Sequence, residues 1–93
     1  MKVLITGANG QLGQEFQKKF NQLKIPYIPT DYQQLDITNI EQIRKLVQKE
    51  KDITHIINCA AYNNVDKAEE EWEKAYTING LAVRNLAIVS NEI

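Results

Sequence analysis

The 93-residue sequence predicts one half of a doubly wound α/β sheet, in which parallel strands alternate with helices in the order β-α-β-α-β-α. Two observations carry this prediction. Short apolar or β-branched segments alternate with segments of helical apolar spacing, which specifies parallel strands joined by right-handed crossovers. The first apolar segment also runs directly into a turn with three glycines, "TGANGQLG". A chain of this length forms one domain at most.

The first strand is predicted over Met1–Thr6, which is almost wholly apolar, as strands buried on both faces of a parallel sheet are. A helix is predicted from Gly10 to about Gln22. Its apolar residues stand at positions 12, 16, 20 and 23 with polar residues between them. This spacing predicts an amphipathic helix with one side packed on the sheet.

Residues 25–30 ("IPYIPT") are predicted to form a second, shorter strand, because each proline keeps the preceding residue extended. A second helix should follow and end near Glu50. Thr38 stands three residues before Glu41, which is the spacing of a capping box. We therefore expect Thr38 to cap this helix.

A third buried strand is predicted over residues 53–60 ("ITHIINCA"), followed by a long helix from Trp72 to about Ser90 that Thr77, Asn79 and Gly80 weaken in its middle. In the strand order 3-2-1-4-5-6 of doubly wound sheets, strand one pairs with a fourth strand. No fourth strand is predicted here. We therefore expect strand one to keep an open apolar edge, which would favour pairing with a second copy in a homo-oligomer.

The three glycines after the first strand predict a cradle for a diphosphate. Gly7 would let the chain turn sharply, Gly10 would let a ligand approach the backbone, and Gly13 would let the helix pack closely. The helix that begins here directs unpaired N–H groups and the positive end of its dipole at the same place. No Gly-Lys-Ser or Gly-Lys-Thr follows, which excludes a P-loop. The pattern predicts a Rossmann-like, dinucleotide-binding fold; the alternative is a tight turn without a ligand.

An acidic residue, Asp31, stands 18 positions past Gly13 at the end of the second predicted strand, where it could accept hydrogen bonds from an adenosine ribose. Its charge would repel a 2′-phosphate, so NADH should at least be tolerated. Asp36 could meet the adenine amine, and Ile37 could pack on the ring. The alternatives are a solvated loop aspartate at position 31 and a turn residue at position 36.

Composition narrows the function classes. A net charge of −1 without a basic stripe argues against nucleic-acid binding. No apolar run approaches the roughly 20 residues that span a membrane, and the sequence begins with a strand-like segment rather than a signal peptide. Cys59 has no partner for an internal disulfide. These features predict a cytoplasmic protein.

The acidic run at residues 69–73 is interpreted as a solvated helix face, and no metal site is expected.

Three blocks of the sequence resemble the dTDP-4-dehydrorhamnose reductases, a family of the extended short-chain dehydrogenase/reductase superfamily. The blocks are "ITGANGQLGQE" at the start, "LDITN" at 35–39 and "INCAAYNNVDKAEEE" at 57–71. The Gly-x-x-Gly-x-x-Gly spacing is the form found in that superfamily. The resemblance covers residues 1–93 but only about the first third of a family member, which implies the N-terminal part of an NAD(P)-binding domain without its substrate domain.

The resemblance implies NADH or NADPH as cofactor and a sugar-nucleotide substrate that is reduced to dTDP-L-rhamnose. Its site residues carry over to Gly10, Gln11 and Leu12 at the diphosphate, Asp31 at the ribose, Asp36 and Ile37 at the adenine end, and Ala60, Ala61 and Tyr62 at the nicotinamide-side ribose.

Family members use a tyrosine acid with a lysine four positions later. No Tyr-x-x-x-Lys occurs in this sequence, so we expect no catalytic residue here and no activity from these residues alone. Two alternatives stay open. One is a noncatalytic regulatory or binding member of the family, and the other is a sugar-nucleotide epimerase or dehydratase.

Overall fold

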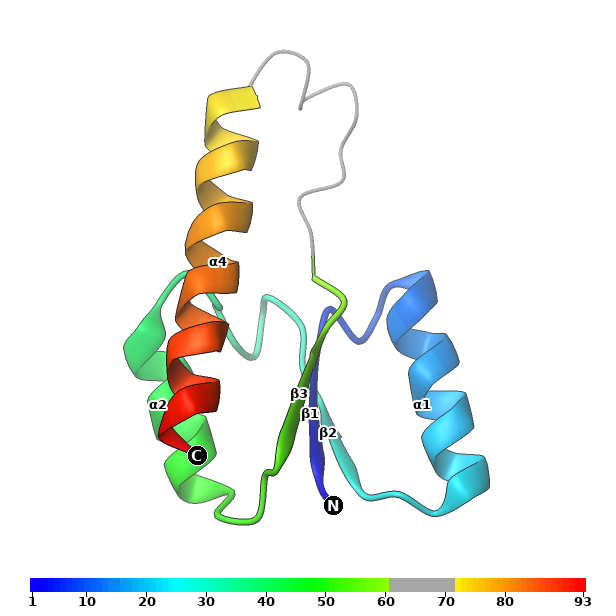
Figure 1. Cartoon of the computed structure of the whole chain (residues 1–93). Helices are drawn as coiled ribbons and strands as arrows, with labels where there is room; N and C mark the ends of the chain where they lie inside the picture. The colour runs from blue at the N-terminus through cyan, green and yellow to red at the C-terminus, as the bar shows by residue number, and fades with distance from the viewer. Residues whose placement is uncertain (61–71) are drawn as a thin grey trace.

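A computed structural model describes the backbone of residues 1–60 and 72–93 and the side chains of residues 1–60 and 79–93. The elements are β1 (Val3–Thr6), α1 (Gln11–Leu23), β2 (Tyr27–Pro29), α2 (Ile40–Lys49), β3 (His55–Asn58) and α4 (Trp72–Glu92). The parallel strands form a layer between α1 on one side and α2 with α4 on the other (Figure 1). The predicted Rossmann-like alternation of strands and helices is confirmed.

The strand order is β2-β1-β3, so β1 is the central strand. Val3 of β1 lies opposite Tyr27 on one side and opposite His55 on the other. The expectation that strand one keeps an open edge is therefore wrong, and so is the argument for a homo-oligomer through that edge. The chain crosses from β2 through α2 to the far side of β1, where β3 occupies the position of the fourth strand in the order 3-2-1-4-5-6.

β3 is only partly buried, contrary to the prediction from its apolar sequence. His55 and Asn58 are exposed, whereas Ile56 and Ile57 are half-buried. Within the described part of the chain, β3 is one edge of the sheet. Because β-branched residues suit central and edge strands alike, composition does not distinguish the two positions.

The core forms two clusters, one on each face of the sheet. Successive side chains of a strand point to opposite faces, so β1 supplies residues to both clusters. Leu4 packs with Ile43 of α2 and Leu86 of α4, while Ile5 packs in the cluster that contains Phe20 of α1. β1 is thus buried on both faces, as predicted.

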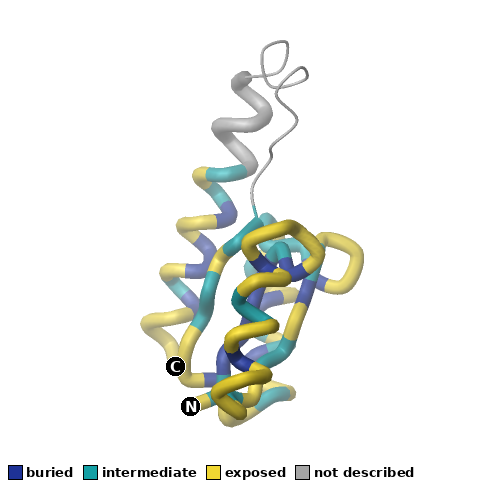
Figure 2. Tube along the Cα trace, turned by 90° about the vertical axis from the view of Figure 1, so that its right-hand side faces the viewer, coloured by how far each residue is buried: buried dark blue, intermediate teal, exposed yellow. Residues whose placement is uncertain are grey.

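α4 is a continuous helix, so the weak helix formers in its middle do not interrupt it. Its buried positions Ala82, Asn85, Leu86 and Val89 follow helical spacing along one side (Figure 2). Among the helices that the structure describes, none is both long and apolar enough to cross a membrane.

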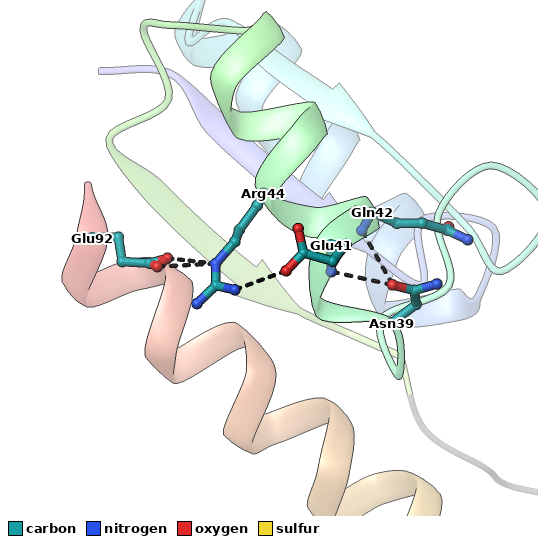
Figure 3. Close-up of polar contacts among 5 residues, drawn as sticks. All are labelled: Asn39, Glu41, Gln42, Arg44 and Glu92. Carbon is teal, nitrogen blue, oxygen red and sulfur yellow. Dashed lines mark hydrogen bonds and ion pairs between the residues drawn. The ribbon is translucent and has the colours of Figure 1, made fainter.

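The start of α2 differs from the prediction by one residue. Asn39 is the N-cap, and its side-chain oxygen accepts hydrogen bonds from the backbone N–H groups of Glu41 and Gln42 at 3.1 and 3.4 Å (Figure 3). The Thr38 hydroxyl instead donates to Oδ1 of Asp36 at 2.6 Å. The prediction of a capping box at Thr38 is therefore wrong. The adjacent asparagine is an equally good cap, and the threonine hydroxyl is already bonded to Asp36.

Candidate functional site

Two of the three glycines are required by packing within the turn between β1 and α1. Gly7 has a φ of +65°, in the left-handed region, and a Cβ there would lie 2.5 Å from the backbone nitrogen of Ala60. A Cβ on Gly13 would lie 2.5 Å from the carbonyl oxygen of Gly7. Gly7 therefore lets the end of β1 approach the end of β3, and Gly13 lets α1 pack against the turn.

Gly10 is different, because the protein leaves room for a side chain there. Its φ is −74°, and the nearest atom to an added Cβ would be the carbonyl oxygen of Gly7 at 3.5 Å, an ordinary contact. Gly10 is the N-cap of α1, and no side chain caps this helix. The first N–H groups of a helix have no partner within it. The start of α1 is therefore open to an external acceptor.

The N–H groups of the turn itself are used internally. Ala8 donates to the carbonyl oxygen of Thr30 at 2.9 Å, Asn9 donates to Oδ2 of Asp31 at 3.0 Å, and Gly10 donates to the carbonyl oxygen of Gly7 at 3.2 Å. An anion at this place would consequently be met by the first amides of α1, beginning with Gln11, rather than by the turn.

A groove of about 640 Å³ lies beside this helix start. This volume is within the range of roughly 300–1,000 Å³ that is common for small-molecule sites. The groove lies at the carboxyl end of β3, the edge at which open α/β sheets bind ligands. It is lined by Gly10, Gln11, Leu12, Glu15, Asn58, Cys59 and Ala60.

The groove explains one departure from the predicted apolar side of α1. Leu12 was expected to pack with Phe16 and Phe20, but 59% of its surface is exposed. It lines the groove instead. An exposed leucine beside uncapped amides suits a ligand with both apolar and anionic parts.

Asn58 and Glu15 line the groove but were missed by the sequence analysis. Oδ1 of Asn58 accepts hydrogen bonds from the Thr6 hydroxyl at 2.6 Å and from the Ala60 N–H at 3.1 Å, which joins the ends of β1 and β3. A polar residue at the end of an apolar strand was the available signal for Asn58. For Glu15 the signal was its position one helical turn after Gln11.

Asp31 is held against the glycine turn. Its Oδ2 accepts the hydrogen bond from Asn9, its Oδ1 accepts one from the N–H of Tyr32 at 2.8 Å, and its own N–H donates to Gln34 at 3.0 Å. It is therefore not a freely solvated loop aspartate. Because a carboxylate offers about four acceptor positions, these two bonds leave capacity for hydroxyl groups of a ligand.

Asp36 and Ile37 are engaged by the protein. Oδ1 of Asp36 accepts hydrogen bonds from the N–H and hydroxyl of Thr38 at 3.0 and 2.6 Å, as the turn-residue alternative predicts. The carbonyl oxygen of Ile37 accepts a bond from Nδ2 of Asn85 at 3.1 Å. None of the described residues that line the groove comes from this loop. Asn85, which is 2% exposed, thus anchors the loop to α4 and was also missed.

Of the three residues predicted at the nicotinamide-side ribose, Ala60 lines the groove, whereas Ala61 and Tyr62 lie outside the described residues.

Burial raises the pKa of the Cys59 thiol, which disfavours the reactive thiolate. In the parts of the chain that the structure describes, no group of three or more acidic, histidine or cysteine side chains could hold a metal ion. The side chains of the acidic run at residues 69–73 lie outside those parts.

The sequence matches the family described as RmlD substrate binding domain over residues 1–93. A dTDP-4-dehydrorhamnose reductase from Aggregatibacter actinomycetemcomitans is 39% identical over 87 residues, which are 92% of this chain and 29% of that protein. The resemblance seen in the sequence is therefore confirmed.

Solved structures of two further dTDP-4-dehydrorhamnose reductases are similar. The enzyme from Clostridium acetobutylicum is 50% identical with a TM-score of 0.84, over 94% of this chain and 31% of that chain. The enzyme from Bacillus anthracis, solved in complex with NADP, is 47% identical with a TM-score of 0.85, over 96% of this chain and 32% of that chain. The chain spans about a third of the length of these relatives. Since the family match extends over every residue of the sequence, the chain belongs to the RmlD substrate binding domain family.

Proposed function

We propose that this chain is the dinucleotide-binding part of an NAD(P)-dependent reductase that transfers hydride to dTDP-4-dehydro-L-rhamnose and forms dTDP-L-rhamnose. One observation carries the proposal: α1 begins uncapped at Gly10 beside a groove at the carboxyl edge of the sheet. A diphosphate there would be bound by unpaired N–H groups and by the positive end of the helix dipole. The names of the relatives, which are reductases, support the reaction.

The strand order supports a ligand that extends across the turn. Asp31 follows β2 and Ala60 follows β3, so the two residues lie on opposite sides of the turn that follows β1. We assign Asp31 to the adenosine ribose and Ala60 to the nicotinamide-side ribose. The nicotinamide supplies the hydride when the cofactor is bound.

The remaining predicted residues take roles along the same path. Gly7 and Gly13 shape the turn, and Gly10 leaves space for the diphosphate. The amides of Gln11 and Leu12 bind it, because the turn's own N–H groups are occupied. We place Asp36 and Ile37 at the adenine end and Ala61 and Tyr62 with Ala60.

We propose that both NADH and NADPH bind. The negative charge of Asp31 disfavours a 2′-phosphate on the neighbouring ribose, which makes NADH acceptable. The Bacillus anthracis relative was solved with NADP, which supports NADPH as well.

We expect no catalysis by this chain alone. Its four tyrosines are followed four positions later by Asp31, Asp36, Asp66 and Gly80, and never by lysine. We place the tyrosine–lysine pair in the two thirds of the relatives' length that this chain does not match. A noncatalytic member of the family is the second candidate, and a reductase assay of a longer gene product distinguishes the two.

Calorimetric titration of the 93-residue chain with NADH and NADPH tests the binding function. Gly10→Val should lower the affinity for both by at least about tenfold, because it fills the space of the diphosphate without straining the turn. Gly80→Val is the matched control, since a Cβ there has no atom within 4 Å, and it should leave the affinity unchanged. Equal affinity of the wild type and Gly10→Val would overturn the assignment.

A further inference from the structure

Two glutamines of α1 reach back to the carbonyl groups of the glycine turn. Nε2 of Gln14 donates to the carbonyl oxygen of Asn9 at 2.8 Å. Nε2 of Gln17 donates to the carbonyl oxygen of Ala8 at 2.8 Å and also to that of Gly13 at 3.2 Å. Helical side chains tilt toward the N-terminus, which is why residues within α1 can contact the turn that precedes it.

With these bonds, two peptide units of the turn are hydrogen-bonded at both their carbonyl and their N–H group. In the unit between Ala8 and Asn9, the carbonyl is bonded by Gln17 and the N–H is bonded to Asp31. In the unit between Asn9 and Gly10, the carbonyl is bonded by Gln14 and the N–H to the carbonyl of Gly7. Because a peptide unit is planar, a bond at each end fixes its orientation.

The glutamines lie on a different side of α1 from the groove. At about 100° per residue, two mean directions can be compared around the axis of α1. The mean direction of Gln14 and Gln17 differs by roughly 140° from that of groove residues 11, 12 and 15. The bonded carbonyl oxygens are therefore held away from the place where an anion would lie. A peptide flip at Asn9 would instead turn a negative carbonyl dipole toward that anion.

We propose that Gln14 and Gln17 are positioning residues for the diphosphate. They keep the carbonyl groups of Asn9 and Ala8 turned away from the groove, so that the ligand meets only the N–H end of α1. The inference rests on the proposed function, since it presumes a diphosphate in the groove.

The test compares a ligand with phosphate and one without it. The 93-residue chain is titrated with ADP and with adenosine and followed by NMR, for the wild type and for Gln14→Met, Gln17→Met and the double variant. Methionine keeps the length of the side chain and a similar helix propensity but cannot donate. The control is Gln22→Met, at an exposed position of the same helix.

The double variant should bind ADP on the order of tenfold more weakly, because the released peptide units can turn a carbonyl oxygen toward the phosphates, and it should bind adenosine as the wild type does. Gln22→Met should change neither affinity. Unchanged ADP binding would overturn the positioning role, and so would an equal loss of both ligands, which would indicate a contribution to folding alone. A wild-type chain that binds no ADP would instead overturn the proposed function itself.

Discussion

Arg44 shares its Nε–H between the two carboxylate oxygens of Glu92 and thereby joins α2 to the end of α4. Nε of Arg44 lies 2.9 and 3.1 Å from the two carboxylate oxygens of Glu92, and Nη1 lies 3.0 Å from Glu41 (Figure 3). The hydrogen bonds from Arg44 hold the pKa of Glu92 below its ordinary value of 4.5. The bonds to Glu92 and Glu41 raise the pKa of Arg44.

Glu92→Gln should lower the melting temperature at pH 7 but not in acid. Because the pKa of Glu92 is depressed in the folded state, its carboxylate stabilises the fold above pH 4.5. That contribution is lost as the pH falls through the depressed pKa. Thermal unfolding followed by circular dichroism at several pH values measures the difference, which should also shrink in high salt because both groups are at the surface. Asp52→Asn, in the exposed turn before β3, is the control. A difference that persists at low pH would contradict this origin.

Gly7→Ala should destabilise the fold strongly, and Gly10→Ala should not. The first change places a Cβ at a φ of +65° and 2.5 Å from the backbone of Ala60, which should cost at least about 2 kcal/mol. At Gly10 the added methyl makes an ordinary contact, so only the cost of alanine at an N-cap, about 1 kcal/mol or less, is expected. Urea denaturation of both variants measures the two free energies. Equal destabilisation would mean that Gly10 too is required by internal packing.

Asp31→Asn should shift cofactor preference toward NADPH. Removal of one charge beside a 2′-phosphate should raise the ratio of NADPH to NADH affinity by on the order of tenfold. The asparagine keeps a carbonyl oxygen that can still accept the hydrogen bond from Asn9. Asp52→Asn, which removes a charge from the exposed turn before β3, should leave the ratio unchanged. If titration shows the same ratio for Asp31→Asn and the wild type, Asp31 does not lie at the ribose.

Asn85→Leu should destabilise the chain by about 1–3 kcal/mol, because it leaves the carbonyl oxygen of Ile37 without its donor. Asn91→Leu, at an exposed position of the same helix, should have little effect. Urea denaturation compares the two variants. An equal free energy of unfolding for Asn85→Leu and the wild type would show that the loop does not depend on this bond.

The alternation of strands and helices was predictable from the sequence because it depends on local spacing. The apolar run before Gly7 and the apolar residues of α1 and α2 report which faces are buried, whatever their neighbours are. The strand order was not predictable in the same way. Nothing in the composition of residues 53–60 says on which side of β1 they pair, because that depends on the crossover through α2.

The glycine turn was predictable, but its polar support was not. Gly7 and Asp31 stand at spacings that follow from the geometry of a strand, a turn and a helix. The supporting hydrogen bonds are made by Gln14, Gln17 and Asn85. They donate to backbone carbonyl groups that lie 5, 9 and 48 residues away in the sequence. Glutamine and asparagine on a helix are ordinarily solvated, so their sequence positions gave no signal.

The central position of β1 has a consequence during synthesis on the ribosome. β1 can pair with β2 once residue 29 has emerged, but its second partner, β3, ends at residue 58. At about 5–20 residues per second, this delay is on the order of seconds. During that interval one row of β1 backbone groups is unpaired beside a strongly apolar face, a template for wrong pairing. The nascent segment "KVLIT" is therefore the place where a chaperone would be expected to bind this chain first.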